Sequence, residues 1–339
     1  MADRNLLIQN FVNTSGWGAA ERNSIAGDAS NRRYDRLIHE NCSVILMDAP
    51  PEKGEDVRPF IAIANHLRKL GFSAPEILEQ DVENGFLILE DFGDDLFARV
   101  LGADPSLSSQ LYSAATDALI ELHHTPAPAN LDSYDPTTMS DLASLAWRWY
   151  AWGLDQPVEP YLTDFQTEFT NCLEKTAADD SVLIQRDYHA ENLLWLPGRT
   201  GVARVGMLDF QCATKGHPAY DLVSLMQDAR RDVPPEIEEE MITRYLTATT
   251  MAPDDFRTAY HVLGAQRNLR ILGIFARLTM QAGKSSYLEL IPRVWDHLMT
   301  DIKHPALAGV ADMIRTTLPE PTPENLNTLR EKCATVPMR

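Results

Sequence analysis

Cysteine is scarce in this chain of 339 residues. Its four cysteines are scattered and form no CxxC pair: Cys42, Cys172, Cys212 and Cys333. This spacing argues against a zinc site or a disulfide framework and fits a reducing compartment. No apolar run approaches the ~18 residues that a membrane-spanning helix needs. The N-terminal MADRNLLIQNFV also lacks a signal-peptide pattern. These absences predict a cytoplasmic protein without a membrane partner.

Positive charge is the second shortage. The chain has 30 Lys and Arg residues against 49 Asp and Glu residues, which gives a net charge of −19. A field of this sign repels phosphate backbones and anionic membrane surfaces, so we expect no nucleic-acid partner. It attracts cationic substrates, and it allows a nucleotide to bind only where local donors or a cation overcome it. The hydrophobic fraction of 44% predicts an ordinary globular protein with room for two lobes.

Hydrophobic periodicity divides the chain into two parts. The first 93 residues favour strands, including one at 86–90, and one helix at 60–71 that ends on Gly71. Beyond residue 96 the pattern is mostly helical. Helices are predicted within 106–124, 138–178 and 218–302, and short strands at 182–185, 193–196 and 203–209. We therefore expect a small α/β lobe over 1–93, with a hinge at about 90–95, and a larger helical lobe over 96–339.

The stretch LIQRDYHAENLLW, residues 183–195, places polar and charged residues between two apolar runs. Asp187 and Asn192 are five positions apart in the expected turn, and VGMLDF brings Asp209 to the end of a later apolar strand. A carboxylate and an amide oxygen on one loop can orient or deprotonate a hydroxyl, or hold a hard divalent cation. A plain polar turn is the alternative, but turn chemistry does not account for Asp209.

The D-x-x-x-x-N pattern followed by D-F is typical of protein-kinase-like phosphoryl transfer. LIQRDYHAENLLW with MLDFQCATKGHPAYDLVSLMQD resembles the aminoglycoside phosphotransferase/choline kinase family, and GDASNRRYDRL, VILMDAPPE and FLILEDFGDDLF extend the likeness over most of the chain. AQRNLRILGIFARL and GKSSYLELIPR are similar to the branch that phosphorylates the anomeric hydroxyl of N-acetylmuramate and N-acetylglucosamine. The resemblance implies an α/β (α+β) protein-kinase-like fold of two lobes.

The resemblance also implies roles for particular residues. Asp187 would be the catalytic base, while Asn192 and Asp209 would hold Mg²⁺ beside ATP. Adenine would be held at the hinge, chiefly by backbone groups. The hinge residues are Glu90, Asp91 and Phe92.

Two positions depart from the family pattern. Gln185 stands where the family usually has a histidine that braces the loop, and an amide can replace those hydrogen bonds. Met47 stands where many members carry the lysine that binds the α/β-phosphates. Because methionine cannot bind phosphate, another cation must neutralise these oxygens.

Arg32 and Arg33 are the predicted substitutes for that lysine. They follow a tight turn at residues 27–30, and the backbone at Ser30 together with a guanidinium could cradle phosphate. A β-hairpin with two solvated arginines is the alternative interpretation. The missing lysine favours a phosphate contact for at least one of the two arginines.

The acceptor site is predicted from fewer signals. His189 lies inside the catalytic loop, and Arg267 and Arg270 recur along one helix, where they could meet the carboxylate of a muramyl substrate. The alternatives are a structural histidine and a solvated arginine stripe. Asp221 is expected to cap a helix or brace the catalytic loop rather than to bind a ligand.

The leading hypothesis is an ATP- and Mg²⁺-dependent kinase of an amino sugar that acts at the anomeric hydroxyl in cell-wall recycling, as a monomer. A kinase of an aminoglycoside, choline or another small amine is the second hypothesis, which the net acidity favours and the C-terminal arginines oppose. A nucleotide-binding pseudokinase or sensor is the third. Met47 and Gln185 are its only support, and the intact Asp187, Asn192 and Asp209 oppose it.

Overall fold

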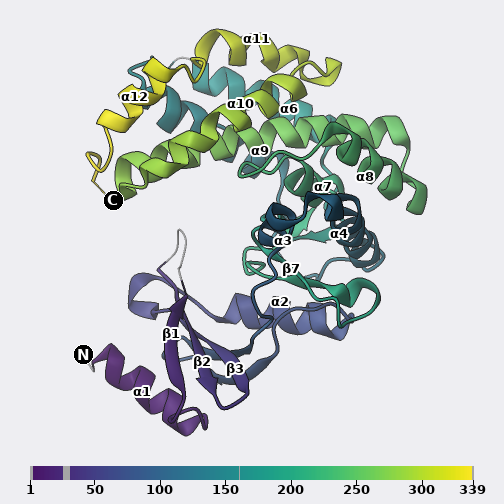
Figure 1. Cartoon of the computed structure of the whole chain (residues 1–339). Coiled ribbons are helices and arrows are strands. Elements are labelled where there is room, and N and C mark those ends of the chain that lie inside the picture. Colours follow the sequence, from purple (N-terminus) through teal and green to yellow (C-terminus); the bar gives the residue numbers. More distant parts are fainter. Residues whose placement is uncertain (1–2, 26–30, 160, 338–339) are drawn as a thin grey trace. The chain divides into compact units, whose positions relative to one another are not determined.

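The computed structural model describes residues 3–25, 31–159 and 161–337, so the predicted turn at 27–30, including Ser30, lies outside the described residues. The chain divides into two compact units (Figure 1). The first consists of Met1–Ala118 with Ala190–Ala213, and the second of Leu119–His189 with Thr214–Arg339. Of the described helices, none is long and apolar enough to cross a membrane.

The first unit is built on an antiparallel sheet of five strands, in the order β1-β2-β3-β5-β4. The strands are β1 Glu21–Ile25, β2 Arg33–His39, β3 Cys42–Asp48, β4 Ile77–Asp81 and β5 Phe86–Glu90. Helix α1 (Arg4–Thr14) packs its apolar residues on one face of this sheet, where they form a buried cluster with side chains of β2, β3 and β5 (Figure 1). The predicted strand at 86–90 is confirmed.

Helix α2 (Arg58–Lys69) follows the sheet's third strand, as the sequence predicted for 60–71. Its buried residues Phe60, Ile63 and Leu67 lie at helical spacing. The helix ends at Lys69 with Leu70 as its C-cap, and Gly71 adopts φ +89°, the left-handed conformation expected of a glycine after a helix. The helix α3 (Phe97–Ala103) also belongs to this unit, and α4 (Ser108–His123) runs through the division between the units.

A short hairpin completes the first unit. Strands β7 (Leu193–Trp195) and β8 (Val205–Met207) pair antiparallel, and bridges join Ser73 to Gly206 and Leu96 to Leu194. These bridges explain why 190–213 is grouped with the N-terminal residues rather than with the helices that follow. The lobe limits expected from the sequence, 1–93 and 96–339, stay a prediction.

The second unit is mainly helical, as the sequence predicted beyond residue 96. Its helices are α5 Pro136–Ala143, α6 Tyr161–Thr176, α7 Ala219–Met226, α8 Pro235–Ala248, α9 Pro253–Ala282, α10 Ile291–Asp301, α11 Ala308–Thr317 and α12 Pro323–Glu331, with a π-helical segment, η3, at Ala146–Ala151. The 30-residue α9 begins with a proline and two acidic residues, and it ends at Gly283, with φ +70°. Strands β6 (Val182–Ile184) and β9 (Thr214–Gly216) pair antiparallel, and the loop that carries Asp187 follows β6.

Candidate active site

The loop that carries Asp187 follows β6, and a buried carboxyl group binds the backbone at its start. Asp221, in the first turn of α7, is completely buried and accepts hydrogen bonds from the backbone N–H groups of Gln185 (2.6 Å) and Arg186 (2.9 Å). Burial raises the pKa of Asp221 to about 7, although the two N–H donors oppose the rise. Asp221 therefore braces the catalytic loop, one of the two roles that the sequence favoured for it.

One predicted site residue, and the residue that precedes another, have unusual backbone geometry. Among the described residues, five non-glycine residues have positive φ: Glu40, Asp155, Arg186, Asp209 and Ala334. Arg186 (φ +72°) directly precedes Asp187, and Asp209 (φ +57°) is itself a predicted metal ligand. Such conformations are costly for residues with a side chain and persist where the surroundings enforce them, often at functional sites.

The hairpin of β7 and β8 carries the two residues predicted to hold Mg²⁺. The backbone N–H of Leu208 donates to the carbonyl of Asn192 (2.9 Å), which ties the residue after the catalytic loop to the strand that leads into Asp209. Asp209 is exposed, and its Oδ1 accepts a hydrogen bond from Gln211 Nε2 (2.6 Å). The next residue, Phe210, is buried against Phe60 of α2, with ring centroids 4.9 Å apart.

The donor set fits a hard cation. Asn192 offers an amide oxygen and Asp209 a carboxylate, and hard cations such as Mg²⁺ prefer oxygen ligands. No group of three or more His, Cys, Asp or Glu residues suited to a metal occurs in the part of the chain that the structure describes. A magnesium ion here would therefore take its other ligands from phosphate and water, as nucleotide-bound magnesium commonly does.

The sheet separates the two arginines that were predicted to bind phosphate. Paired residues of β2 and β3 point to the same face, so Arg33 shares a face with Asp48, and Tyr34 shares the opposite face with Met47. Asp48 is buried beside α1 and accepts from Arg33 Nη2 (2.7 Å) and from Arg4 Nη2 (2.6 Å). This ion pair holds Arg33 on the α1 face, opposite to the face of Met47. We therefore propose no phosphate contact for Arg33.

Arg32 lies on the other side of the strand. Its Nε donates to Glu55 (2.8 Å), and its side chain is 13% exposed. Burial raises the pKa of Tyr34, the Arg32 charge lowers it, and the Asp209 charge raises it. Tyr34, on the Met47 face, thus senses both the Arg32 charge and the Asp209 charge, which keeps Arg32 a candidate phosphate ligand.

The side chains of the predicted hinge have structural partners. Arg199 pairs with Glu90 (2.5 Å), and its guanidinium carbon lies 5.0 Å from the ring centre of Phe92. Burial would raise the pKa of Asp91, but hydrogen bonds from the Gly93 N–H, Ser43 and Arg36 bring it below the usual range. The binding of adenine by backbone groups of the hinge stays a prediction.

Two predicted acceptor residues, both in the second unit, sense the charge of Asp187. Arg267 of α9 is 3% exposed, and its Nη1 donates to the carbonyl of Gln227 (3.2 Å). Burial lowers the pKa of Arg267, and the Asp187 charge raises it. Arg270 is half-buried, and the charges of Tyr220, Tyr134 and Asp187 raise its pKa against the effect of burial. Arg267 is therefore no part of a solvated stripe.

His189 is also enclosed. It is 7% exposed, and burial lowers its pKa to about 4, so the imidazole is neutral at pH 7. The charges of Asp228 and Asp187 oppose this shift, whereas those of Arg230 and Arg267 reinforce it. His189 and Arg267 thus share an environment with Asp187 and with Asp228, a residue that the sequence analysis missed. In the sequence, Asp228 is one charged residue among several in MQDARRD, and nothing there marks it as buried.

Comparison with known proteins identifies the family of the chain. The model of the phosphotransferase enzyme family matches residues 21–258. An N-acetylmuramate/N-acetylglucosamine kinase of Caulobacter vibrioides is 39% identical over 338 residues, covering 88% of this chain and 92% of that protein. A kinase of the same name from Pseudomonas aeruginosa is 34% identical, covering 90% of this chain and 91% of that protein.

The fold has solved counterparts. The structure of a choline kinase from Streptococcus pneumoniae matches 87% of this chain and 99% of that one with a TM-score of 0.59, at 14% identity. This likeness concerns the fold alone, and it confirms the predicted kinase-like architecture. The match of the family model and the identity to the two bacterial kinases together show that the chain belongs to the phosphotransferase enzyme family.

Proposed function

We propose that this protein transfers the γ-phosphoryl group of ATP to the anomeric hydroxyl of an amino sugar, N-acetylmuramate or N-acetylglucosamine. The observation that carries the proposal is the 39% identity, over 88% of the chain, to a kinase named for these two sugars. The braced loop at Asp187 and the buried Arg267 near it support the same acceptor class.

In the proposed reaction, Asp187 orients the attacking hydroxyl and accepts its proton. Asp221 supports this role because it holds the two backbone N–H groups that precede Asp187. A magnesium ion held by Asn192 and Asp209 would neutralise charge on the nucleotide phosphates. Arg32 would supply the second cation that Met47 cannot, and Arg267 would meet the carboxylate of N-acetylmuramate.

The arginines argue against a cationic acceptor. Arg267 and Arg270 both act electrostatically on Asp187, and a positively charged aminoglycoside or choline would meet their repulsion. The intact set of Asp187, Asn192 and Asp209 opposes a nucleotide sensor without catalysis.

A turnover assay tests the proposal. The protein is incubated with ATP and Mg²⁺ and, separately, N-acetylmuramate, N-acetylglucosamine, kanamycin and choline, and the products are followed by ³¹P NMR. We expect a sugar 1-phosphate signal with the two amino sugars. Turnover of kanamycin or choline alone would instead support an amine kinase, and ATP binding without any turnover would support a sensor.

A further inference from the structure

The chain directly after α7 carries a buried carboxylate that the proposed mechanism does not use. Asp228 is 1% exposed, and its Oδ1 accepts a hydrogen bond from the backbone N–H of Arg230 (2.8 Å). Its Oδ2 is fully buried and has no hydrogen-bond partner among the described residues. Because a buried carboxylate oxygen without a donor is costly, a ligand that brings a donor would be favoured there.

A buried donor lies beside this acceptor. Arg267 Nη1 donates to the carbonyl of Gln227, the residue before Asp228. Within the described part of the chain, Nε of Arg267 has no hydrogen-bond partner. The charge of Asp228 raises the pKa of Arg267, and both residues act on His189, which also senses Asp187. A donor without a partner, Arg267 Nε, and an acceptor without a partner, Asp228 Oδ2, thus belong to neighbouring residues in the described part of the chain. Both residues act electrostatically on His189, in the loop that carries Asp187.

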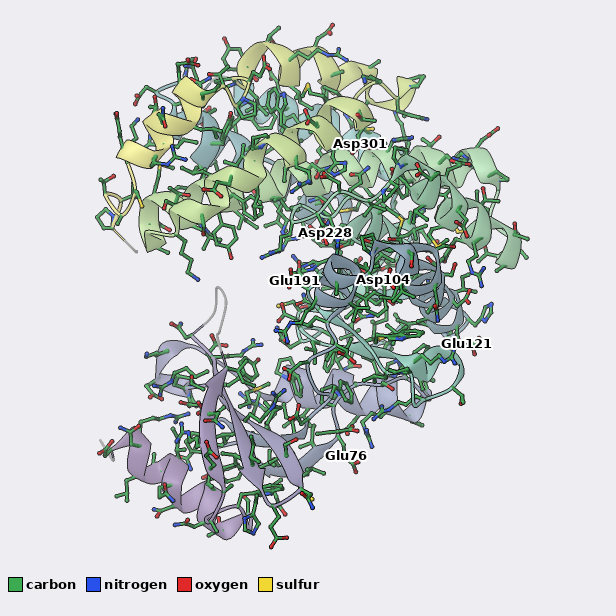
Figure 2. All side chains as sticks on the ribbon, in the orientation of Figure 1. Glu76, Asp104, Glu121, Glu191, Asp228 and Asp301 are labelled. Atoms are coloured by element: carbon green, nitrogen blue, oxygen red, sulfur yellow. The ribbon has the colours of Figure 1, made fainter. Side chains whose placement is uncertain are left out.

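Helix α7 determines where this pair lies relative to the loop. Asp221, in its first turn, holds the backbone before Asp187. At its other end, Gln227 Nε2 donates to Asp301 Oδ1 (3.0 Å), and Gln227 Oε1 accepts from Asn268 (2.7 Å). Asp301 is completely buried, and Figure 2 labels it together with Asp228. Helix α7 is thus held by a buried carboxyl group at each end, and it connects the loop at Asp187 to the pair.

We propose that Asp228 and Arg267 form an acceptor-recognition pair, in which Asp228 Oδ2 accepts a hydrogen bond from a hydroxyl or amide N–H of the sugar and Arg267 Nε donates one to a sugar oxygen. The proposal rests on the proposed function and specifies its acceptor. An N-acetylated sugar offers both kinds of group close together. A polycationic acceptor would satisfy Asp228 but meet repulsion from Arg267.

The variant Asp228→Asn tests the pair. Asparagine keeps an oxygen for the Arg230 N–H, so the local turn is retained, while the charge at Oδ2 is lost. We expect the Kd of N-acetylglucosamine, measured by calorimetry, to rise by about 10–100-fold, which is the value of a hydrogen bond to a charged group. KM for the sugar should rise in parallel, whereas kcat and the Kd of ATP should stay within about twofold.

Asp312→Asn is the matched control, because it makes the same change at a side chain that is 93% exposed. It should bind the sugar as wild type does. Equal sugar affinity in Asp228→Asn and wild type would overturn the recognition pair while leaving the proposed function intact. A wild-type protein that neither binds nor phosphorylates the amino sugars would overturn both.

A second variant keeps the test decisive if Asp228→Asn fails to fold. Arg267→Lys retains the charge but loses the Nε–H, so it should weaken the binding of both sugars. If Arg267 binds the carboxylate of N-acetylmuramate, the change should raise the Kd of N-acetylmuramate more than the Kd of N-acetylglucosamine. A uniform loss of kcat with no change in either sugar Kd would mark Arg267 as structural and overturn the pair.

Discussion

At the scale of single residues, the catalytic loop is defined by its backbone more than by its side chains. Arg186 adopts a left-handed φ of +72°, and the buried Asp221 accepts from two successive N–H groups just before Asp187. A loop whose backbone is held in this way keeps its shape when the side chain of the base is replaced by one of the same size. The effect of changing Asp187 should therefore be confined to chemistry.

We expect Asp187→Asn to reduce kcat by about 10²–10⁴-fold, since a positioned base contributes that much to proton transfer. The Kd of ATP–Mg²⁺, measured by calorimetry, should change little. Asp312→Asn, which alters a side chain that is 93% exposed, is the control and should retain full activity. More than a tenth of wild-type kcat in Asp187→Asn would show that another group is the base.

The two neighbouring arginines should respond in opposite ways. Arg32→Ala should raise KM for ATP by about tenfold or more, because a charge-assisted hydrogen bond to phosphate is lost. Arg33→Ala should leave that KM unchanged and instead lower the free energy of unfolding by about 1–3 kcal/mol, because the buried Asp48 loses one of its two guanidinium partners. The first quantity is read from initial rates and the second from denaturant unfolding.

Adenosine separates a phosphate contact from a general loss of the fold. It has no phosphates, so wild type and Arg32→Ala should bind it equally. A reversed pattern, in which only Arg33→Ala impairs ATP use, would return the phosphate contact to Arg33.

The two arginines also show where sequence reasoning stopped. The spacing of Asp187, Asn192 and Asp209 could be read directly because the loop and hairpin that carry them are local in the chain. Arg32 and Arg33 are adjacent in sequence, but a strand sends them to opposite faces, and the partner that decides each one's role is distant: Glu55 for the first and Asp48 for the second. Asp228 was missed for the same reason, since its burial depends on the fold of the whole second unit.

At the scale of elements, α9 depends on two glycines that let neighbours approach its backbone. A Cβ on Gly264 would lie 2.3 Å from Asp301 Oδ2, and a Cβ on Gly273 would lie 2.3 Å from the carbonyl oxygen of Leu145. Leu145 directly precedes the π-helical segment η3. The contact at Gly273 is the more demanding one, because a backbone carbonyl cannot turn aside as a side chain can.

We therefore expect Gly273→Ala to lower the free energy of unfolding by about 1–3 kcal/mol, the usual cost of forcing extra atoms into a packed interface. Gly102→Ala, in α3, is the matched control: its added Cβ meets nothing within 4 Å, so the higher helix propensity of alanine should stabilise the protein by up to ~1 kcal/mol. Thermal or denaturant unfolding measures both. If the two changes had equal effects on the free energy of unfolding, the backbones of α9 and of the residue before η3 could move apart without loss of stability.

Elements were predicted with uneven success. Strand β5 and helix α2 could be read from the sequence because their apolar periodicity is strong and a glycine marks the end of α2. The sequence did not reveal that η3 is π-helical, because a π-helical turn leaves no distinct apolar periodicity in so short a segment. It also did not reveal that the β7–β8 hairpin bridges to Ser73 and Leu96, since isolated bridges leave no periodic pattern.

At the scale of the whole molecule, buried titratable groups act in opposite directions on stability. Burial lowers the pKa of His123 to about 3 and of His189 and His217 to about 4. Burial raises the pKa of Asp221 to about 7 and of Asp301 to about 6. Between pH 4 and 6 the unfolded chain binds more protons at the three histidines, and the folded protein binds more at the two carboxyl groups.

Stability contributed by the histidines falls as the pH falls from about 6.5 to about 4, whereas the carboxyl groups add stability over the same range. Asp301→Asn removes one of the compensating groups, so its thermal midpoint should decline more steeply than that of wild type between pH 6 and 4. Melting curves across this range, compared with those of Asp312→Asn, give the slopes. Parallel slopes for Asp301→Asn and wild type would mean that Asp301 is already ionised in the folded protein.

The methionine in β3 has a consequence for chemical labelling. Reactive ATP analogues that acylate amines identify kinases through the lysine beside the phosphates, and β3 (Cys42–Asp48) contains no lysine. The buried thioether of Met47 is not acylated, and neither is the guanidinium of an arginine such as Arg32. A proteome-wide survey with such reagents would therefore find no amine to label on this strand, even in a cell where the enzyme is abundant and active.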